Sequence, residues 1–253
     1  MSSLDPNKSL PPLPPLKSFS LTHIVYDPTH PLSIPLTLLS LSPIFLFVSY
    51  FTLTIFTRRL TILLLAAGQL GNEVLSWILK RLLKGDRPYM GHGEVGTGYG
   101  MPSSHSQAAG FLVAWGIGYS WTLASRGKRE GNGNGRLGVV RRIRNGIYIL
   151  GLLIWSIGVS YSRWHLHYHS PIQIIAGYSV GLVAGATYFW LTEYLPIYHP
   201  GSLVGQIRKK VEYLWEGVGG VGGWELGDAK GGWGEGWLVI GKDETGQKKK
   251  KSR

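Results

Sequence analysis

The chain contains no cysteine among its 253 residues. Disulfide bonds and thiolate metal ligands are therefore excluded, and cysteine usage leaves the redox compartment open. A second absence concerns residues 1–20, which are rich in Pro, Leu, Ser and Lys. They lack the uninterrupted apolar core that follows a basic start in a cleaved signal peptide. We interpret them as a flexible polar arm.

Acidic residues are scarce, with 14 Asp and Glu against 26 Lys and Arg, so the formal net charge is +12. The basic residues gather in residues 126–144 and at the extreme C-terminus. Beside hydrophobic segments, such clusters set membrane orientation or contact anionic lipid. None of the motifs typical of nucleic-acid readers is present. We therefore predict a membrane partner and no nucleic-acid partner.

Long apolar runs dominate the middle of the chain. A helix needs about 20 apolar residues to cross the roughly 30 Å hydrocarbon core. Gln69, Asn72 and Glu73 interrupt the second run, and interhelical hydrogen bonding is favoured over a substrate role for them. The sequence predicts an all-α fold: a polytopic integral-membrane helical bundle of about five transmembrane helices. The predicted spans are 33–56, 60–83, 106–124, 146–160 and 172–195.

Composition predicts three regions. Residues 1–32 form the N-terminal arm and an amphipathic interfacial segment, in which His23 and Asp27 are interpreted as local hydrogen-bonding residues. Residues 33–195 form the transmembrane domain. Residues 196–253 form a flexible, Gly-rich, basic tail that cannot build a core. Its C-terminal lysines resemble an endoplasmic-reticulum retrieval signal, with a solvated basic tail as the equal alternative. Three tail tryptophans are candidates for membrane-surface contact, Trp224, Trp233 and Trp237.

Charge also predicts the orientation in the membrane. The loop 126–144 is cytosolic by the positive-inside rule, and Arg58 and Arg59 fall on the same side. Loops 84–105 and 161–170 then share the opposite face. The same count places the N-terminus outside and the C-terminus in the cytosol. Asn7, in an Asn-Lys-Ser triplet, is consequently a glycosylation acceptor on the accessible side.

The two non-cytosolic loops carry residues that are costly at a membrane boundary and usually mark chemistry. Lys80 and Arg87 are seven residues apart, which on a helix places them on one face. Pro88 disfavours helix at Arg87, and Arg163 adds a third cation. Three converging cations are typical of a site for a multiply charged anion such as phosphate. Snorkelling is favoured for two neighbouring cations, Arg81 and Lys84.

Histidines accompany these cations. Pro102-Ser103-Ser104-His105 stands before the third span, where a serine N-cap and exposed backbone N–H groups form an anion site. His165 and His169 would share a helical face, and with His105 they could bind zinc. The absence of a nearby acidic ligand and the repulsion of the cations disfavour that metal site. The interpretation that uses every residue is phosphoryl transfer without a metal or other cofactor, in which one imidazole attacks phosphorus and another protonates the leaving oxygen.

These residues resemble the three-part signature of the type 2 phosphatidic-acid phosphatase superfamily, over about residues 60–195. The parts are Lys80 with six residues before Arg87-Pro88, then Pro102 to His105, then Ser162-Arg163 with five residues before His169. The resemblance implies that His169 is the nucleophile and His105 the general acid. It also implies that Lys80, Arg87, Ser103, Ser104 and Arg163 bind the substrate phosphate.

Two positions differ from the usual pattern of the superfamily. Ser104 stands where Gly is usual, and Gln173 stands where an Asp normally orients the nucleophilic histidine, so Gln173 joins the predicted catalytic residues. Both resemble the dolichyl-diphosphatase branch, which acts on a polyprenyl diphosphate at the lumenal face of the endoplasmic-reticulum membrane and recycles the carrier for protein N-glycosylation. The alternatives are a phosphatase of phosphatidate or a sphingoid-base phosphate, and a lipid-binding membrane protein without turnover. The sequence leaves the oligomeric state and the accepted lipid chain length open.

Overall fold

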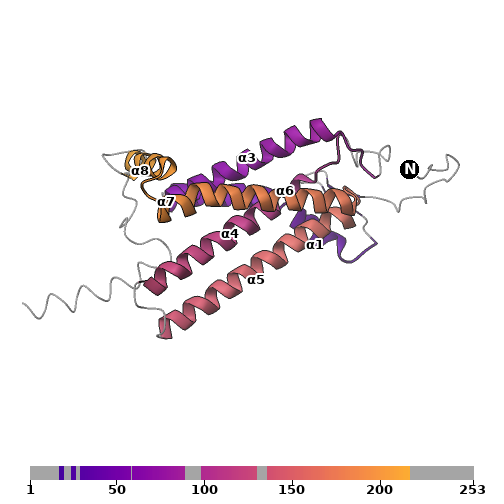
Figure 1. The fold of residues 1–253 in the computed structure, drawn as a ribbon. Coiled ribbons are helices and arrows are strands. Elements are labelled where there is room, and N and C mark those ends of the chain that lie inside the picture. Colours follow the sequence, from indigo (N-terminus) through magenta and orange to yellow (C-terminus); the bar gives the residue numbers. More distant parts are fainter. Residues whose placement is uncertain are drawn as a thin grey trace, which may run out of the picture. The chain divides into compact units, whose positions relative to one another are not determined.

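The structure is a computed structural model whose elements are almost all helical (Figure 1). Several predictions from the sequence fall outside the residues that it describes: Asn7, His23, Asp27, Arg58, and the tail tryptophans and lysines. The segment predicted to be interfacial is partly a strand, because β2 (Ile24–Tyr26) pairs antiparallel with β1 (Lys17–Phe19). The described residues are 17–19, 24–26, 29–57, 59–88, 98–129 and 136–216.

The described residues belong to two compact units. The first unit comprises the chain up to Phe45 together with Gly68–Trp190. The second comprises Leu46–Ala67 and the chain from Leu191 onward. All of the predicted site residues lie in the first unit, so the site is described within that unit alone.

The predicted first span is a pair of helices, α1 (Ser33–Ser40) and α2 (Ser42–Thr57), bent by 41° at the break. The second is α3 (Leu60–Leu83), whose bounds match the prediction because the apolar run and the helix coincide. α3 is one of three described helices that are long and apolar enough to cross a membrane, or of four if the bent pair is one span. The prediction of five spans is therefore not confirmed.

The predicted third span lies within α4 (Ser104–Arg129), which is not among those three helices. α4 packs against both α5 (Arg136–His165) and α6 (Pro171–Phe189). It contributes much of the buried hydrophobic core, including Ala109, Phe111 and Val113. A helix whose side chains meet other helices does not need a surface as apolar as that of a helix facing lipid.

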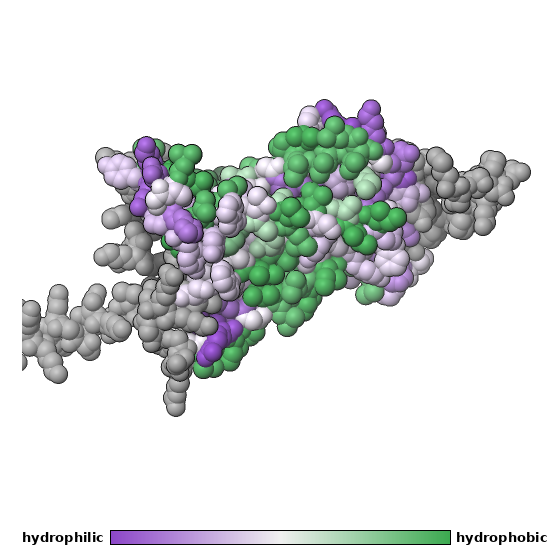
Figure 2. Space-filling model, viewed as in Figure 1, coloured by the Kyte–Doolittle hydropathy of each residue, from purple (hydrophilic) through white to green (hydrophobic). Residues whose placement is uncertain are grey.

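α5 differs most from its prediction, because it begins at Arg136 and not near Gly146. Arginine is a good helix former, so a basic segment continues a helix although it ends an apolar run. Exposed hydrophobic side chains recur along α5 at helical spacing, at Ile147, Leu150, Ile154 and Ile157. Figure 2 shows hydrophobic residues covering much of the visible face of the helices. Such a stripe is typical of a surface that contacts lipid.

The contact of α6 with α4 is close enough to require glycine. A Cβ atom at Gly177 would meet the backbone of Ser103, and one at Gly181 would meet the backbone carbonyl of Gln107. Small residues at four-residue spacing let helix backbones approach in a membrane. This approach brings the first residues of α4 against the first turns of α6.

Up to Glu216, where the described part of the chain ends, three further helical elements follow α6. A π-helical segment, η1 (Trp190–Tyr194), leads into α7 (Leu195–Tyr198), and α8 (Leu203–Glu216) lies beyond. α8 falls in the segment where composition predicts only a flexible tail. Within the second unit, Arg208 forms an ion pair with Glu193 at 3.4 Å.

Candidate active site

Hydrogen bonds connect the segments that carry the three sequence motifs. Lys80 Nζ, in the last turn of α3, donates to Ser104 Oγ at 3.3 Å. The backbone N–H of Ser103 donates to the carbonyl of Gln173 at 3.1 Å. The structure therefore brings the start of α4 beside the end of α3 and the start of α6. The segments carry Lys80, Arg87, Ser103, Ser104, His105, Arg163, His169 and Gln173.

The end of α3 differs from its prediction. The helix stops at Leu83, and Lys84 has a positive φ of 45°. Left-handed backbone ends a helix, so Arg87 lies in the following segment and the predicted shared helical face with Lys80 is wrong. Arg87 Nε donates to the carbonyl of Gly98 at 3.3 Å. Arg87 is thus held by the segment that leads to α4.

A tight reversal after α5 places His169. The helix ends at His165, and His167 has a φ of 60°, which a side chain adopts only at a cost. The backbone N–H groups of Tyr168 and His169 then donate to the carbonyl of Arg163, at 3.1 and 3.2 Å. The turn sets the nucleophile candidate beside the last turn of α5.

The same reversal contradicts the prediction that His165 and His169 share a helical face, because the helix ends four residues before His169. His165 Nε2 instead lies 3.4 Å from Ser33 Oγ, and its ring contacts that of His30, with centroids 4.6 Å apart. Within the described ranges, no three His, Asp or Glu side chains are grouped closely enough to hold a metal ion.

Gln173 contacts all three motif segments. Its Nε2 donates to the carbonyl of Asp86, next to Arg87, at 2.6 Å. Its Oε1 accepts from the N–H of Ser170 at 3.1 Å and completes a capping box at the start of α6. Its backbone carbonyl accepts from Ser103, as described above. One buried residue thus connects the motif segments through its side chain and its backbone carbonyl.

These contacts also orient the His169 imidazole, which is only 3% exposed. Because Gln173 Nε2 donates to a carbonyl, its Oε1 faces His169 Nδ1, at 3.4 Å. An amide oxygen can only accept a hydrogen bond, so Nδ1 carries the proton in this arrangement. The lone pair of His169 is consequently on Nε2, the nitrogen turned away from Gln173.

Arg163 is the most deeply buried of the three site cations, by which we mean Lys80, Arg87 and Arg163. It is 6% exposed, its NH1 donates to Ser40 Oγ at 2.7 Å, and its guanidinium lies 4.1 Å from the centre of the Tyr168 ring. Its buried Nε has no hydrogen-bond partner among the described residues. A buried donor without a partner is costly, and an anionic ligand would satisfy it.

Burial and positive charge together set the protonation of the two histidines. Burial first, and then the site cations, lower the pKa of His169 to about 3, although the hydrogen bond with Gln173 acts in the opposite direction. Burial, followed by neighbouring positive charge that is chiefly from Arg163, also lowers the pKa of His105 well below its usual value. Both imidazoles are therefore neutral at pH 7 in this site. A bound anion would raise both pKa values by offsetting the cations.

Ser40 is a site residue that the sequence analysis did not identify. Besides accepting from Arg163 through its hydroxyl, Ser40 acts through its backbone on His105 and favours the protonated form of that imidazole. A sequence signal did exist, because Ser33, Thr37 and Ser40 lie at helical spacing within an apolar run and are all buried in α1. Hydroxyl side chains on one face of such a helix are typical of an interhelical contact.

The comparisons with known proteins decide the family. Residues 59–196 match the family model of the PAP2 superfamily. The chain belongs to this superfamily. It is 32% identical over 195 residues to the dolichyldiphosphatase of Saccharomyces cerevisiae, a match that covers 75% of this chain and 74% of that protein. It is 36% identical over 178 residues to dolichyldiphosphatase 1 of Homo sapiens, covering 70% and 72%.

A third relative, dolichyldiphosphatase 1 of Dictyostelium discoideum, is 30% identical over 175 residues, covering 69% of this chain and 71% of that protein. No solved structure matches the chain significantly. Family membership confirms the resemblance that the three motif parts suggest, and the helical membrane fold agrees with it.

Proposed function

We propose that this PAP2 superfamily member hydrolyses dolichyl diphosphate to dolichyl phosphate and inorganic phosphate through a phosphohistidine on His169. The observation that carries the proposal is the buried, neutral His169 imidazole, held by Gln173 beside three cations. The names of the relatives support the substrate, because the yeast, human and Dictyostelium proteins are dolichyldiphosphatases.

The negative charge of the substrate offsets the positive charge of the site cations. Within the described part of the chain, the site cations make no ion pair with a carboxylate. A diphosphate supplies the missing negative charge, and the unpartnered Nε–H of Arg163 supplies a donor for one of its oxygens. Ser103 and Ser104 add hydroxyl donors, and the first turn of α4 adds backbone N–H groups.

In the first step, His169 Nε2 attacks the terminal phosphorus and the bond from that phosphorus to the bridging oxygen breaks. The leaving group is dolichyl phosphate, whose bridging oxygen receives a proton from His105. That step needs protonated His105, and the negative charge of the substrate raises the pKa of His105 toward this state. The site cations stabilise charge on the phosphoryl oxygens, a role that magnesium fills in many phosphoryl-transfer enzymes.

In the second step, water attacks the phosphohistidine. His105, now neutral, accepts a proton from the water, the bond from phosphorus to Nε2 breaks, and inorganic phosphate leaves. Both histidines return to their starting protonation states after proton exchange with solvent. Histidine is an established covalent nucleophile in enzymes, and the Nδ1 proton held by Gln173 keeps Nε2 available for both steps.

The test is phosphate release by the purified protein in a metal chelator. We expect release from dolichyl diphosphate and its loss in His169→Ala. The matched control is His165→Ala, which removes a histidine of the same turn region that contacts Ser33 and not Gln173. Preference for phosphatidate or a sphingoid-base phosphate would overturn the substrate, and binding without release from any lipid phosphate would overturn the enzyme.

The proposed location is the endoplasmic-reticulum membrane with the site on the lumenal face. α5 begins in the basic segment near Arg136 and ends at His165 beside the site. The positive-inside rule places its basic end in the cytosol, so its other end faces the lumen. A reporter inserted near Gly131 should be modified only from the cytosol. Lumenal modification there would contradict this orientation.

A further inference from the structure

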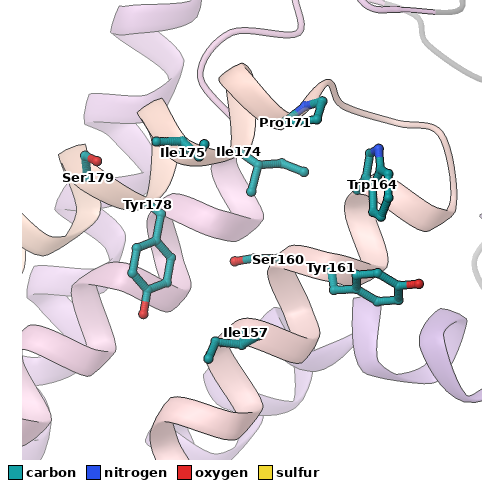
Figure 3. A pocket seen from close by; sticks show the side chains of 9 residues that line it. All are labelled: Ile157, Ser160, Tyr161, Trp164, Pro171, Ile174, Ile175, Tyr178 and Ser179. Carbon is teal, nitrogen blue, oxygen red and sulfur yellow. The ribbon is translucent and has the colours of Figure 1, made fainter.

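An apolar groove runs between α5 and α6, beside the segment 165–170 that connects them (Figure 3). These two helices make few direct contacts with each other, although both pack on α4. The resulting cavity has a volume of about 480 Å³, within the range of pockets that hold small organic ligands. Seven of its nine lining residues are hydrophobic or aromatic, and the other two are serines: Ile157, Ser160, Tyr161, Trp164, Pro171, Ile174, Ile175, Tyr178 and Ser179.

The groove begins at the level of the proposed nucleophile. Its lining residues Trp164 and Pro171 flank the segment 165–170 that connects the helices and contains His169. From there it extends along α5 to Ile157 and along α6 to Ser179. At about 1.5 Å per helical residue, this is a length of roughly 10–12 Å. The groove therefore starts at the end of the two helices that the segment with His169 connects, and it extends from there along both helices toward the middle of the membrane.

Its wall is complementary to a hydrocarbon and not to a headgroup. No charged residue lines it. The hydroxyl of Tyr178 is paired with Ser156 at 3.0 Å, so the tyrosine presents its ring and not a free polar group. Ser160 Oγ is buried without a hydrogen-bond partner among the described residues. A small serine at this point leaves space between the two helices, as Figure 3 shows.

We propose that this groove binds the first isoprene units of the substrate, those next to the diphosphate. The inference rests on the proposed function and extends it, because the same molecule occupies both sites. A chain that leaves a diphosphate at His169 must enter the hydrocarbon layer, and the α5 and α6 groove provides a protein-lined path at that point. Branched isoprene units fit a surface of isoleucine side chains and aromatic rings by van der Waals contact.

The expected energetic effect is modest for a physical reason. A lipid tail that moves from the membrane into an apolar groove gains packing and no hydrophobic transfer energy. The groove should therefore change the affinity for the chain by about tenfold at most, and should leave the chemical step unchanged. This predicts an effect on KM without an effect on kcat.

The experiment fills the groove with Ser160→Phe in the full-length protein. The control is Val74→Phe, which adds a similar side chain on a 56% exposed position of α3. KM and kcat are measured for isopentenyl, farnesyl and dolichyl diphosphates and for dilauroyl phosphatidate. Taking the ratio of variant to parent for each substrate cancels its partition into detergent micelles.

We expect Ser160→Phe to raise KM for the farnesyl and dolichyl substrates by about tenfold, with unchanged kcat. The increase should be smaller for isopentenyl diphosphate, whose single isoprene unit occupies only the start of the groove, and the control should show none. The proposal would be overturned if the ratio of variant KM to parent KM were the same at all chain lengths. It would also be overturned if that ratio exceeded one for no substrate. An equal increase for phosphatidate would show a site for any lipid chain and overturn the commitment to isoprenoids. If the parent protein releases phosphate from no isoprenoid diphosphate, the proposed function itself is wrong. That result differs from failure of the groove proposal alone, in which the parent is active and Ser160→Phe has no chain-length effect.

Discussion

Replacing Gln173 tests whether an amide can orient the proposed nucleophile. Gln173→Ala removes an acceptor for His169 Nδ1, an acceptor for the Ser170 N–H and a donor to the Asp86 carbonyl. Each intramolecular hydrogen bond contributes about 0.5–1.5 kcal/mol. Gln173 is 6% exposed, so the groups left behind are also poorly solvated. We therefore expect a loss of roughly 1.5–4.5 kcal/mol in the free energy of unfolding.

The effect on catalysis is separate from the effect on stability. At 3.4 Å, the contact with Nδ1 is long, so its direct energy is at the low end of that range. Its loss lets the imidazole take the other tautomer or rotate away from phosphorus. We expect kcat to fall by about 10-fold to 100-fold. The serine-protease carboxylate is worth about ten-thousand-fold, since it also offsets a charge that develops on the ring, which glutamine cannot do.

Gln173→Glu provides the matched comparison. Glutamate keeps the acceptor for His169 but places a carboxylate oxygen against the Asp86 carbonyl, where the amide donates at 2.6 Å. Its charge should raise the pKa of His169 from about 3. His169 must be neutral to attack, so activity is lost as the pH falls through its pKa. The acid limb of kcat/KM should consequently move to higher pH.

The assay is steady-state phosphate release from dolichyl diphosphate, from below the His169 pKa of about 3 up to pH 9, together with thermal unfolding in detergent. Parent-like kcat in Gln173→Ala, measured on protein that remains folded, would refute the orienting role. An acid limb that stays in place in Gln173→Glu would refute the proximity of residue 173 to the attacking imidazole.

Three further predictions follow from the site and its packing. Ser40→Ala removes the 2.7 Å acceptor of Arg163. Hydrogen bonds to charged groups contribute about 1.5–3 kcal/mol, so we expect at least a roughly tenfold loss of kcat/KM in phosphate release. Gly181→Ala should lower the melting temperature by overpacking α6 on α4, at a cost of about 1–3 kcal/mol, whereas Gly151→Ala, where a Cβ would meet nothing, should not. The basic limb of kcat should lie at higher pH than that of kcat/KM, since the bound substrate raises the depressed pKa of His105; coincident limbs would contradict this.

The parts that could be predicted from the sequence are those set by local chemistry or by the membrane. α3 follows its apolar run from Leu60 to Leu83 because the thickness of the bilayer fixes the length of such a run. The three motif parts fall together because each lies at one end of an apolar run, on the same predicted face. Hydropathy was less informative for α4, which packs against both α5 and α6.

The remaining features depend on backbone conformation and long-range contacts. After α5 ends at His165, the chain reverses with a positive φ at His167, and this reversal separates His165 from His169. Nothing in the spacing of the histidines predicts it. The role of Ser40 depends on a partner 123 residues away in the chain. A hydroxyl within an apolar helix indicates a contact but does not identify the side chain that it meets.

The charge balance of the site also argues for a diphosphate over a monophosphate. The site cations form no ion pair with a carboxylate in the described ranges, and after burial they are the main cause that lowers the pKa of His169 to about 3. A ligand with more negative charge offsets more of this repulsion. It also raises the pKa of His105 further toward the protonated state that the leaving group requires. The lipid product of the proposed reaction carries one phosphate fewer, so it is held less tightly and raises the pKa of His105 less. A site with glutamine in place of the usual carboxylate thus takes its counter-charge from the substrate and loses it when the reaction is complete.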